Sequence, residues 1–222
     1  MGMHKNKFLF ILFCLIALPF LLYAHASHPE LENLSGGNIT LRYIQLGFTH
    51  ILPLGLDHIL FVLSIYLLNP NIRQVLWQTA AFTLAHSITL ALAILGIISP
   101  DPHIVEPLIA LSIVMVALEN FFTDKVSVYR IVLIFGFGLV HGMGFSGVLS
   151  ELGMPKSQFV NALVSFNVGV ELGQITVILL AYFIVVKWFR HEIWFRKRIV
   201  YPASGTIALV ALYWTIERIF FT

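Results

Sequence analysis

The stretch GFTHILPLGLDHILF, residues 47–61, places two histidines and an aspartate inside a run that is otherwise apolar. An ionised side chain near the middle of a membrane-spanning helix costs about 2.5–3.5 kcal/mol on insertion scales. Later apolar runs repeat the pattern with His86, Glu119, His141 and Glu171. A chain that keeps so many ionisable groups at membrane depth is expected to use them, most simply to hold or move a cation.

The composition is that of a polytopic membrane protein. Hydrophobic residues make up 59% of the 222 residues and charged residues only 11%, whereas soluble domains are roughly a quarter charged. The mean hydropathy is +0.90. The net charge of +2 comes from basic residues in short loops and does not indicate nucleic-acid binding. Because Cys14 is the single cysteine, any metal site must use nitrogen and oxygen ligands.

Residues 1–26 have the pattern of a secretory signal peptide. Two lysines precede an apolar core, and Ala24-His25-Ala26 supplies a small-x-small cleavage motif. The alternative is an uncleaved anchor helix. We expect residues 27–45 to form a short external segment after cleavage.

Residues 46–222 are predicted to form one transmembrane domain, which makes the fold class all-α and polytopic with six helices. Each apolar run approaches the ~20 residues that cross a bilayer core, and turn signals separate the runs. The expected spans are 46–68, 75–98, 104–122, 130–149, 159–186 and 199–220.

The distribution of basic residues predicts the orientation. If the first span runs from outside to inside, eight lysines and arginines fall inside and three outside, as the positive-inside rule favours. The inner set is Arg73, Lys125, Arg130, Lys187, Arg190, Arg196, Lys197 and Arg198, and the outer set is Arg42, Lys156 and Arg218. We therefore expect both mature termini outside; assembly into a homo-oligomer stays open.

The first span carries the strongest candidate site. His50 and Asp57 are seven residues apart, which puts them on one helical face, and His58 follows Asp57. Pro53 removes a backbone hydrogen bond and should kink or break the helix between them. Gly55 would allow another helix to approach closely. The alternative to a metal or proton site is an Asp–His pair that only ties helices together.

The second span has a polar stripe on one face. Thr79, Thr83, His86 and Ser87 stand at positions i, i+4, i+7 and i+8, with His86 near mid-membrane. His86 is therefore either a ligand or a structural histidine that is satisfied by hydrogen bonds.

The third and fourth spans add three polar positions. Glu119, followed by Asn120, is either an inner relay site or an interfacial charge. His141 lies between Gly138 and Gly142, a G-x-x-x-G pair that favours tight helix contact.

The fifth span places Asn167, Glu171 and Gln174 on one face, beside a second small-residue pair, Gly169 and Gly173. A carboxylate flanked by amides suits an outer partner or counter-ion for histidine ligands.

The ligand set that these spans offer is nitrogen and oxygen. His58, His86 and His141 with Asp57 would suit nickel, cobalt, zinc or ferrous iron, and spacing alone does not choose among these metals.

These polar islands, in this order, resemble the HupE/UreJ family of bacterial membrane proteins, which are proposed nickel permeases serving hydrogenase and urease. The resemblance covers roughly residues 45–185. It rests on Glu119-Asn120 and on five segments: GLDHILF at 55–61, FTLAHSITL at 82–90, VEPLIALSI at 105–113, FGLVHGMGF at 137–145 and FNVGVELGQ at 166–174.

The chain departs from the family pattern in two motifs. The first motif of the better-studied permeases has the form H-P-x-x-G-x-D-H, whereas here His50 is one residue further from Asp57 and the proline is displaced. The later motif resembles H-G-x-A-H-G-x-E, of which only His141-Gly142 remains. The chain thus looks like a divergent branch, in which Asp57, His58 and His141 carry over by position.

The resemblance and the residues together predict a permease for a divalent transition metal, nickel first, in the lipid bilayer of the bacterial inner membrane. No ATP-binding loop is present in the sequence, so a gradient or trapping of metal inside would supply the energy. The expected route runs through His50, Asp57 and His58, then His86 and His141 with Asn167 and Glu171 alongside, and finally Glu119. No tightly bound cofactor is expected.

Two alternatives stay open. Three histidines could hold zinc with an open position for water, as in an intramembrane hydrolase with Asp57 or Glu171 as base. The chain could instead be a non-transporting accessory or scaffold protein whose polar groups serve only helix association.

Histidine ligation predicts a pH dependence. Ligand histidines must be neutral to bind metal, so uptake should fall as the external pH drops below ~6.5, the unperturbed histidine pKa. Metal uptake into cells or vesicles between pH 5 and pH 8 measures this. A flat profile from intact protein would argue against histidine ligands.

Overall fold

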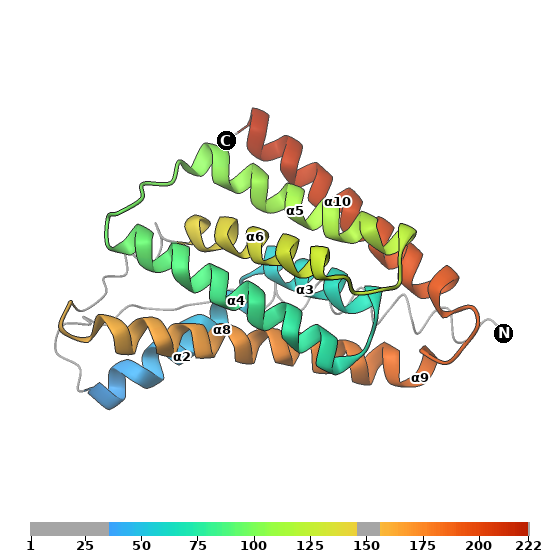
Figure 1. Ribbon diagram of the computed structural model, residues 1–222, viewed down its shortest axis with the longest axis horizontal. Coiled ribbons are helices and arrows are strands. Elements are labelled where there is room, and N and C mark those ends of the chain that lie inside the picture. Colours follow the sequence, from blue (N-terminus) through green and yellow to red (C-terminus); the bar gives the residue numbers. More distant parts are fainter. Residues whose placement is uncertain (1–35, 146–155, 222) are drawn as a thin grey trace.

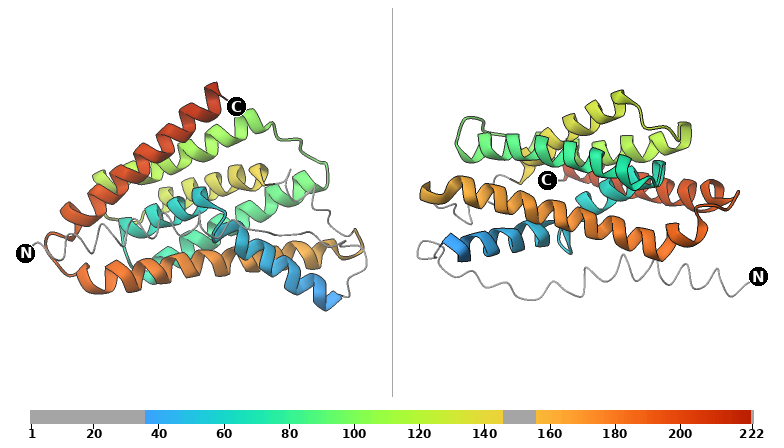
Figure 2. Two further views of the ribbon diagram at one scale, coloured as in Figure 1. Left: turned by 180° about the vertical axis from the view of Figure 1, so that it is seen from behind. Right: turned by 60° about the horizontal axis from the view of Figure 1, so that its bottom comes forward.

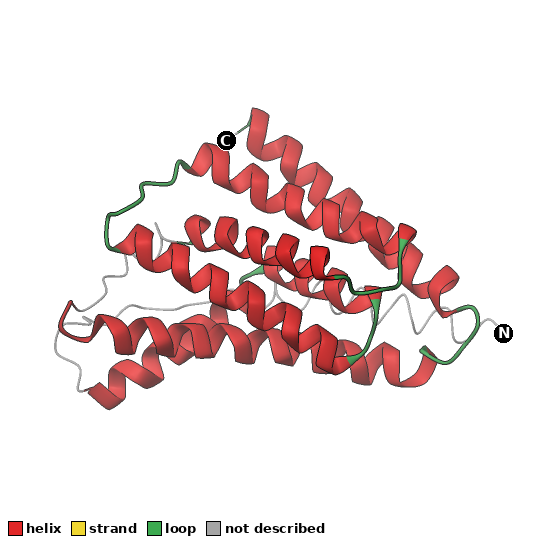
Figure 3. Cartoon of the chain, in the orientation of Figure 1, coloured by secondary structure: helices red, strands yellow, loops and turns green. Residues whose placement is uncertain are grey.

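The computed structural model describes residues 36–145 and 156–221. Within these ranges every element is a helix and no strand occurs (Figure 3). The principal helices, labelled in Figure 1, are α2 (Gly36–Ile51), α3 (Leu56–Leu68), α4 (Ile72–Ile94), α5 (Pro102–Phe122), α6 (Val128–Gly144), α8 (Phe159–Ala181) and α10 (Tyr201–Phe220). Short elements η2 (Lys156–Gln158), η3 (Tyr182–Val186), α9 (Lys187–Phe189) and η4 (Arg196–Val200) extend α8 and α10.

The long helices confirm a helical membrane protein but not the count of six full spans. Among the described residues, four helical stretches are long and apolar enough to cross a membrane: 72–94, 102–122, 159–189 and 196–220. The pair α2 and α3 passes the same test only as one broken span, and α6 is a shorter apolar helix of 17 residues. Exposed apolar side chains on each long stretch, such as Leu84, Leu111, Leu172 and Leu209, give a surface that suits hydrocarbon.

The start of the first span differs from the expectation. The predicted signal peptide, residues 1–26, and positions 27–35 lie outside the described residues, as do positions 146–149 of the fourth predicted span. The helix begins at Gly36, ten residues before the expected limit, so part of the predicted external segment is helical. Its inner face explains this, because Ile39 and Tyr43 are buried and Thr40 donates a hydrogen bond of 3.0 Å to Asn161 of α8.

Proline breaks the first span where the sequence predicts. α2 ends at Ile51, α3 begins at Leu56, and the axes of the two helices differ by 71°. The Leu52–Pro53 bond is cis. Gly55 allows a close approach within the broken span itself, because an added side chain would collide with the His50 carbonyl in the last turn of α2. The bend is visible from behind in Figure 2.

The helices alternate in direction across the bundle. Figure 1 shows the connections 68–72, 122–128 and 189–196 at one end and the connection 94–102 with the end of α10 at the other. The first end carries most of the basic residues, in agreement with the predicted loop assignment. Asn120 ties α5 to its neighbours at this end, because its amide donates hydrogen bonds to the Ser64 carbonyl at 3.0 Å and the Ser204 hydroxyl at 2.9 Å.

Glycines bring the helices into backbone contact, as both predicted small-residue pairs indicate. On α6, a Cβ at Gly138 would lie 2.5 Å from the Phe82 carbonyl oxygen of α4, and one at Gly142 would collide with the His86 carbonyl. On α8, Gly169 faces the Ile44 backbone and Gly173 faces the Ile51 side chain in the same way. Such contacts matter in a bilayer because packing, and not the hydrophobic effect, drives association between spans.

The α4–α6 contact predicts a difference between two glycines of one helix. Gly138→Ala should lower stability by about 1–3 kcal/mol, because the methyl group has no room against the Phe82 carbonyl. Gly136→Ala meets nothing within 4 Å and should be neutral or stabilising by about 0.5–1 kcal/mol. Thermal unfolding of the purified variants in detergent measures both. Equal unfolding midpoints would show that the two helices are not in close contact.

Candidate metal site

The helix break brings the two histidines of the first span together. In an unbroken helix, residues eight apart stand about 12 Å apart along the axis. Here His50 in the last turn of α2 and His58 in the first turn of α3 have ring centroids 4.6 Å apart. Pro53 therefore creates the pairing of His50 with His58 that an intact helix would prevent.

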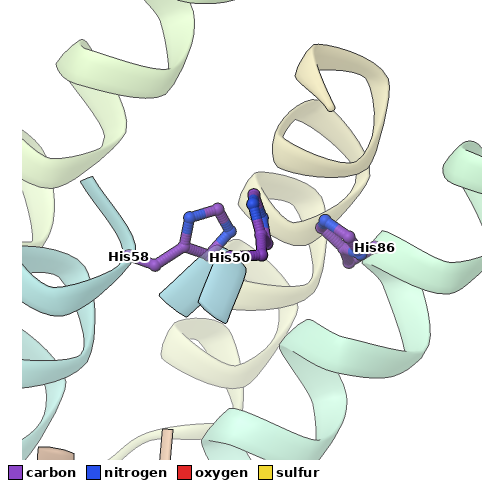
Figure 4. A group of neighbouring side chains, drawn as sticks. All are labelled: His50, His58 and His86. Atoms are coloured by element: carbon purple, nitrogen blue, oxygen red, sulfur yellow. The ribbon is translucent and has the colours of Figure 1, made fainter. Parts of the chain in front are cut away.

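A third histidine comes from α4. The His86 ring lies 6.1 Å from that of His50 and 5.9 Å from that of His58. One ligand atom from each of the three rings lies within 4.8 Å of the others. Figure 4 shows the three rings side by side, each from a different helix. We call His50, His58 and His86 the histidine group.

His141 of α6 lies next to the histidine group. Its ring is 5.0 Å from that of His58. Its Nε2 is 3.1 Å from the Ser112 hydroxyl oxygen of α5, and that hydroxyl donates to the Ile109 carbonyl. The Ser112 hydroxyl oxygen therefore accepts a hydrogen bond from Nε2–H, which leaves an unshared lone pair on Nδ1 of His141. This tautomer would make His141 a fourth available ligand.

Five ring nitrogens of these four histidines are buried and lack hydrogen bonds to any described residue. His58, His86 and His141 are 6%, 0% and 1% exposed. Within the described residues, no partner is found for Nε2 of His50 and His58, for either nitrogen of His86, or for Nδ1 of His141. A buried polar atom without a partner costs about 1–3 kcal/mol. A metal ion bound between the rings of His50, His58 and His86 would coordinate one nitrogen of each ring.

Phenylalanine rings enclose the histidines. The Phe145 ring lies 3.8 Å from that of His50 at a tilt of 41°, and Phe82 lies 5.7 Å from His58 and 5.0 Å from His141. Phe166 lies 6.5 Å from His86. These apolar walls exclude water, so an ion would exchange its hydration shell for imidazole ligands when it enters. Imidazole nitrogens suit nickel, cobalt, copper, zinc and iron better than magnesium or calcium.

Asp57 does not join the histidine group, although the sequence predicts it as a ligand. Its Oδ2 accepts a hydrogen bond from Arg218 Nη2 at 2.9 Å, in an ion pair with the last turn of α10. The helix break explains the difference, because the seven-residue register between His50 and Asp57 holds only in a continuous helix.

Glu119 also has a partner that the sequence did not indicate. It forms an ion pair with Arg130 of α6, whose Nε donates to Gln78 Oε1 at 2.8 Å. Arg130 is 1% exposed and the Glu119 side chain 27%, so the pair is partly buried between α4, α5 and α6. A carboxylate held by arginine is a poor exit ligand for a metal. With Asn120 bonded to Ser64 and Ser204, neither predicted relay residue of α5 faces the histidines.

The three predicted residues of the fifth span have different neighbours on α4: Asn167 lies beside His86, and Glu171 and Gln174 contact threonines. Asn167 lies close enough to His86 to interact with it, and its Oδ1 has no hydrogen bond. Glu171 accepts hydrogen bonds from Thr79 and Thr83, and Gln174 also contacts Thr83. Only Asn167 thus stands beside the histidine group. The Ser87 hydroxyl donates a hydrogen bond of 2.6 Å to the Thr83 carbonyl within α4.

Arg218, Arg130 and Ser112 are the neighbours that sequence reasoning missed. A signal was available for the arginines, because carboxylates at membrane depth need a cation and these two arginines lie within or beside apolar spans. No sequence signal could have paired Ser112 with His141, because nothing in the spacing relates α5 to α6.

The fold and the site define a helical multi-pass membrane protein with a histidine-rich site buried between its helices. A family model described as HupE / UreJ protein matches residues 27–218. The chain therefore belongs to the HupE/UreJ family, as the sequence motifs suggested. No curated protein matches the chain, and no solved structure does.

The Asp57–Arg218 pair leads to a double-mutant prediction. Both side chains are about one-fifth exposed, at 22% and 20%, so the pair is largely shielded from solvent. Asp57→Asn and Arg218→Gln should each lower the unfolding midpoint, and the double variant should lose less than the sum. Thermal unfolding should give a coupling energy of about 0.5–3 kcal/mol.

Metal binding by the same variants tests whether Asp57 is a ligand. Asp57→Asn should keep its metal affinity, because Asp57 lies outside the histidine group, and Glu217→Gln on α10 serves as the control. Loss of binding by folded Asp57→Asn alone would return Asp57 to the ligand set.

Proposed function

We propose that this protein is a permease for a divalent transition metal, nickel first and cobalt next, with His50, His58 and His86 as its binding site. The observation that carries the proposal is the set of buried, unpartnered ring nitrogens from three helices, with ligand atoms within 4.8 Å of one another. Membership of the HupE/UreJ family supports the same substrate class.

The state of the ring nitrogens favours metal binding over a scaffold role. Histidines that only tied helices together would direct their nitrogens at carbonyls or hydroxyls of neighbouring spans. Among the described residues, Ser112 provides the one such bond in this cluster, and it leaves Nδ1 of His141 available. Buried nitrogens that lack hydrogen bonds cost free energy, and a bound metal would recover part of it. Such a group is typical of a binding site.

The surroundings favour transport over hydrolysis. A zinc hydrolase needs a carboxylate or an equivalent base beside the metal-bound water. Asp57 is paired with Arg218, and both oxygens of Glu171 accept hydrogen bonds from threonines. Phenylalanine rings, which cannot act as a base, instead line much of the histidine group.

Two ion pairs at opposite ends of the bundle suit an alternating-access mechanism. Asp57–Arg218 joins α3 to the last turn of α10, and Glu119–Arg130 joins the ends of α5 and α6 at the other end. In this mechanism the pairs hold the site closed on both sides and separate in turn. The broken first span supplies the movable element, because discontinuous helices line the binding sites of many transporters.

Metal binding by the purified protein in detergent tests the proposal. Titration with Ni²⁺, Co²⁺, Zn²⁺ and Fe²⁺ should reach about one equivalent with the wild type. His86→Gln should weaken binding by at least about tenfold, because even an outer partner of a metal site is worth 10–100-fold. His103→Gln, at an exposed histidine of α5, is the matched control and should bind like the wild type.

Uptake into liposomes then separates a carrier from an enzyme. Metal should enter vesicles that contain the wild type and the His103 variant but not those with His86→Gln. If the folded protein binds no transition metal, the permease and the zinc hydrolase both fail. Binding without uptake, under any imposed gradient, would favour the hydrolase.

A further inference from the structure

A second polar cluster lies one helical turn from the histidine group, between α4 and α8. Thr83 Oγ1 is 2.7 Å from Glu171 Oε2 and 3.2 Å from Gln174 Oε1. Thr79 Oγ1 is 3.3 Å from Glu171 Oε1. Five side-chain oxygens from four residues therefore converge at this position: both of Glu171 and one each of Thr79, Thr83 and Gln174. We call them the oxygen cluster.

The oxygen cluster has more hydrogen-bond acceptors than the two threonine hydroxyls have hydrogens to donate. The Thr83 hydroxyl carries one hydrogen but faces two acceptors, Glu171 and Gln174. The Thr79 hydroxyl likewise faces Glu171 and the Leu76 carbonyl at 3.2 Å. Gln174 is 0% exposed and its Nε2 has no partner within the described residues. Reversing this amide would satisfy Thr83 but leave the buried amide oxygen without a donor.

The charge of Glu171 is also uncompensated. Of the carboxylates in the spans, Asp57 is paired with Arg218 and Glu119 with Arg130. Among the described residues, no lysine or arginine forms an ion pair with Glu171, which stands in the middle of α8. A lone negative charge at membrane depth is costly, so one positive charge at this point would balance it.

We propose that Glu171, Thr79, Thr83 and Gln174 bind a small, hard monovalent cation, with sodium as the ion of choice. Carboxylate, hydroxyl and amide oxygens are hard ligands, and the cluster offers no imidazole nitrogen to a transition metal. A single carboxylate balances one positive charge and not two. A proton on Glu171 Oε2 would let that oxygen donate to Thr83, but the Thr79 hydroxyl would still face two acceptors, whereas a cation would be held by the oxygens of all four residues.

The position of this cation site suggests that it couples to metal transport. Thr83 and His86 are three residues apart on α4, a rise of about 4.5 Å. On α8, Glu171 is one turn from Asn167, the residue beside His86. Occupation of one site would thus fix the side chains that border the other. This coupling rests on the proposed function, whereas the cation site itself does not.

Binding of ²²Na⁺ to the purified full-length protein in sodium-free detergent buffer tests the site. The wild type should bind about one sodium per chain, displaced by excess Na⁺ or Li⁺ and poorly by K⁺. Glu171→Gln and Thr83→Val should lower the affinity by at least about tenfold, the value of a hydrogen bond to a charged group. Glu217→Gln on α10 and Thr176→Val on α8, whose hydroxyl bonds to the Leu172 carbonyl, are matched controls.

Transition-metal binding by the same samples reports on folding and keeps the two proposals distinct. If the folded protein binds metal but no sodium, the cation site is wrong and the permease proposal stands. If sodium binds and the two variants lose it while no metal binds, the permease proposal fails and the cation site stands. Sodium binding that Glu171→Gln and Thr83→Val leave unchanged, or a pH-sensitive Glu171 with no response to sodium, would overturn the proposal.

Discussion

The break at Pro53 is the constraint on which the histidine site depends. Proline cannot donate the backbone hydrogen bond that a continuous helix needs, so the first span becomes two helices that differ in direction by 71°. Irregular backbone is tolerated at membrane depth only where protein covers it or where it lines a cavity. Here the break places His50 against His58, and Gly55 makes room for the His50 carbonyl.

The second requirement is close approach of the remaining helices. Gly138 and Gly142 let α6 meet the backbone of α4, which carries His86, and glycines of α8 do the same for α2. The histidine group is thus assembled from helices that touch through small residues, and phenylalanines fill the space around the rings. Such packing fixes ring positions without a hydrogen bond to each nitrogen, which leaves the nitrogens available to a ligand.

Three carboxylates within the described spans, Asp57, Glu119 and Glu171, have different kinds of partner. Asp57 and Glu119 each have an arginine, as the cost of charge in hydrocarbon demands. Glu171 has threonine hydroxyls and a glutamine in place of an arginine, one turn from the histidines. The two nearby clusters differ in chemistry, since one offers imidazole nitrogens and the other oxygens, and they would therefore select different ions.

The sequence by itself determined the membrane class, the helical fold, the break at Pro53, the glycine contacts and the family, because each depends on local composition or on spacing within one segment. It also identified four histidines whose polar side chains are costly to place in apolar spans: His50, His58, His86 and His141. Only the tertiary structure decided which of these meet. In a broken helix, residues seven apart no longer share a face. Asp57 therefore forms an ion pair with Arg218, while His58 lies against His50. Contacts between helices, such as Ser112 with His141, depend on how the helices pack, and no periodicity within one span records that.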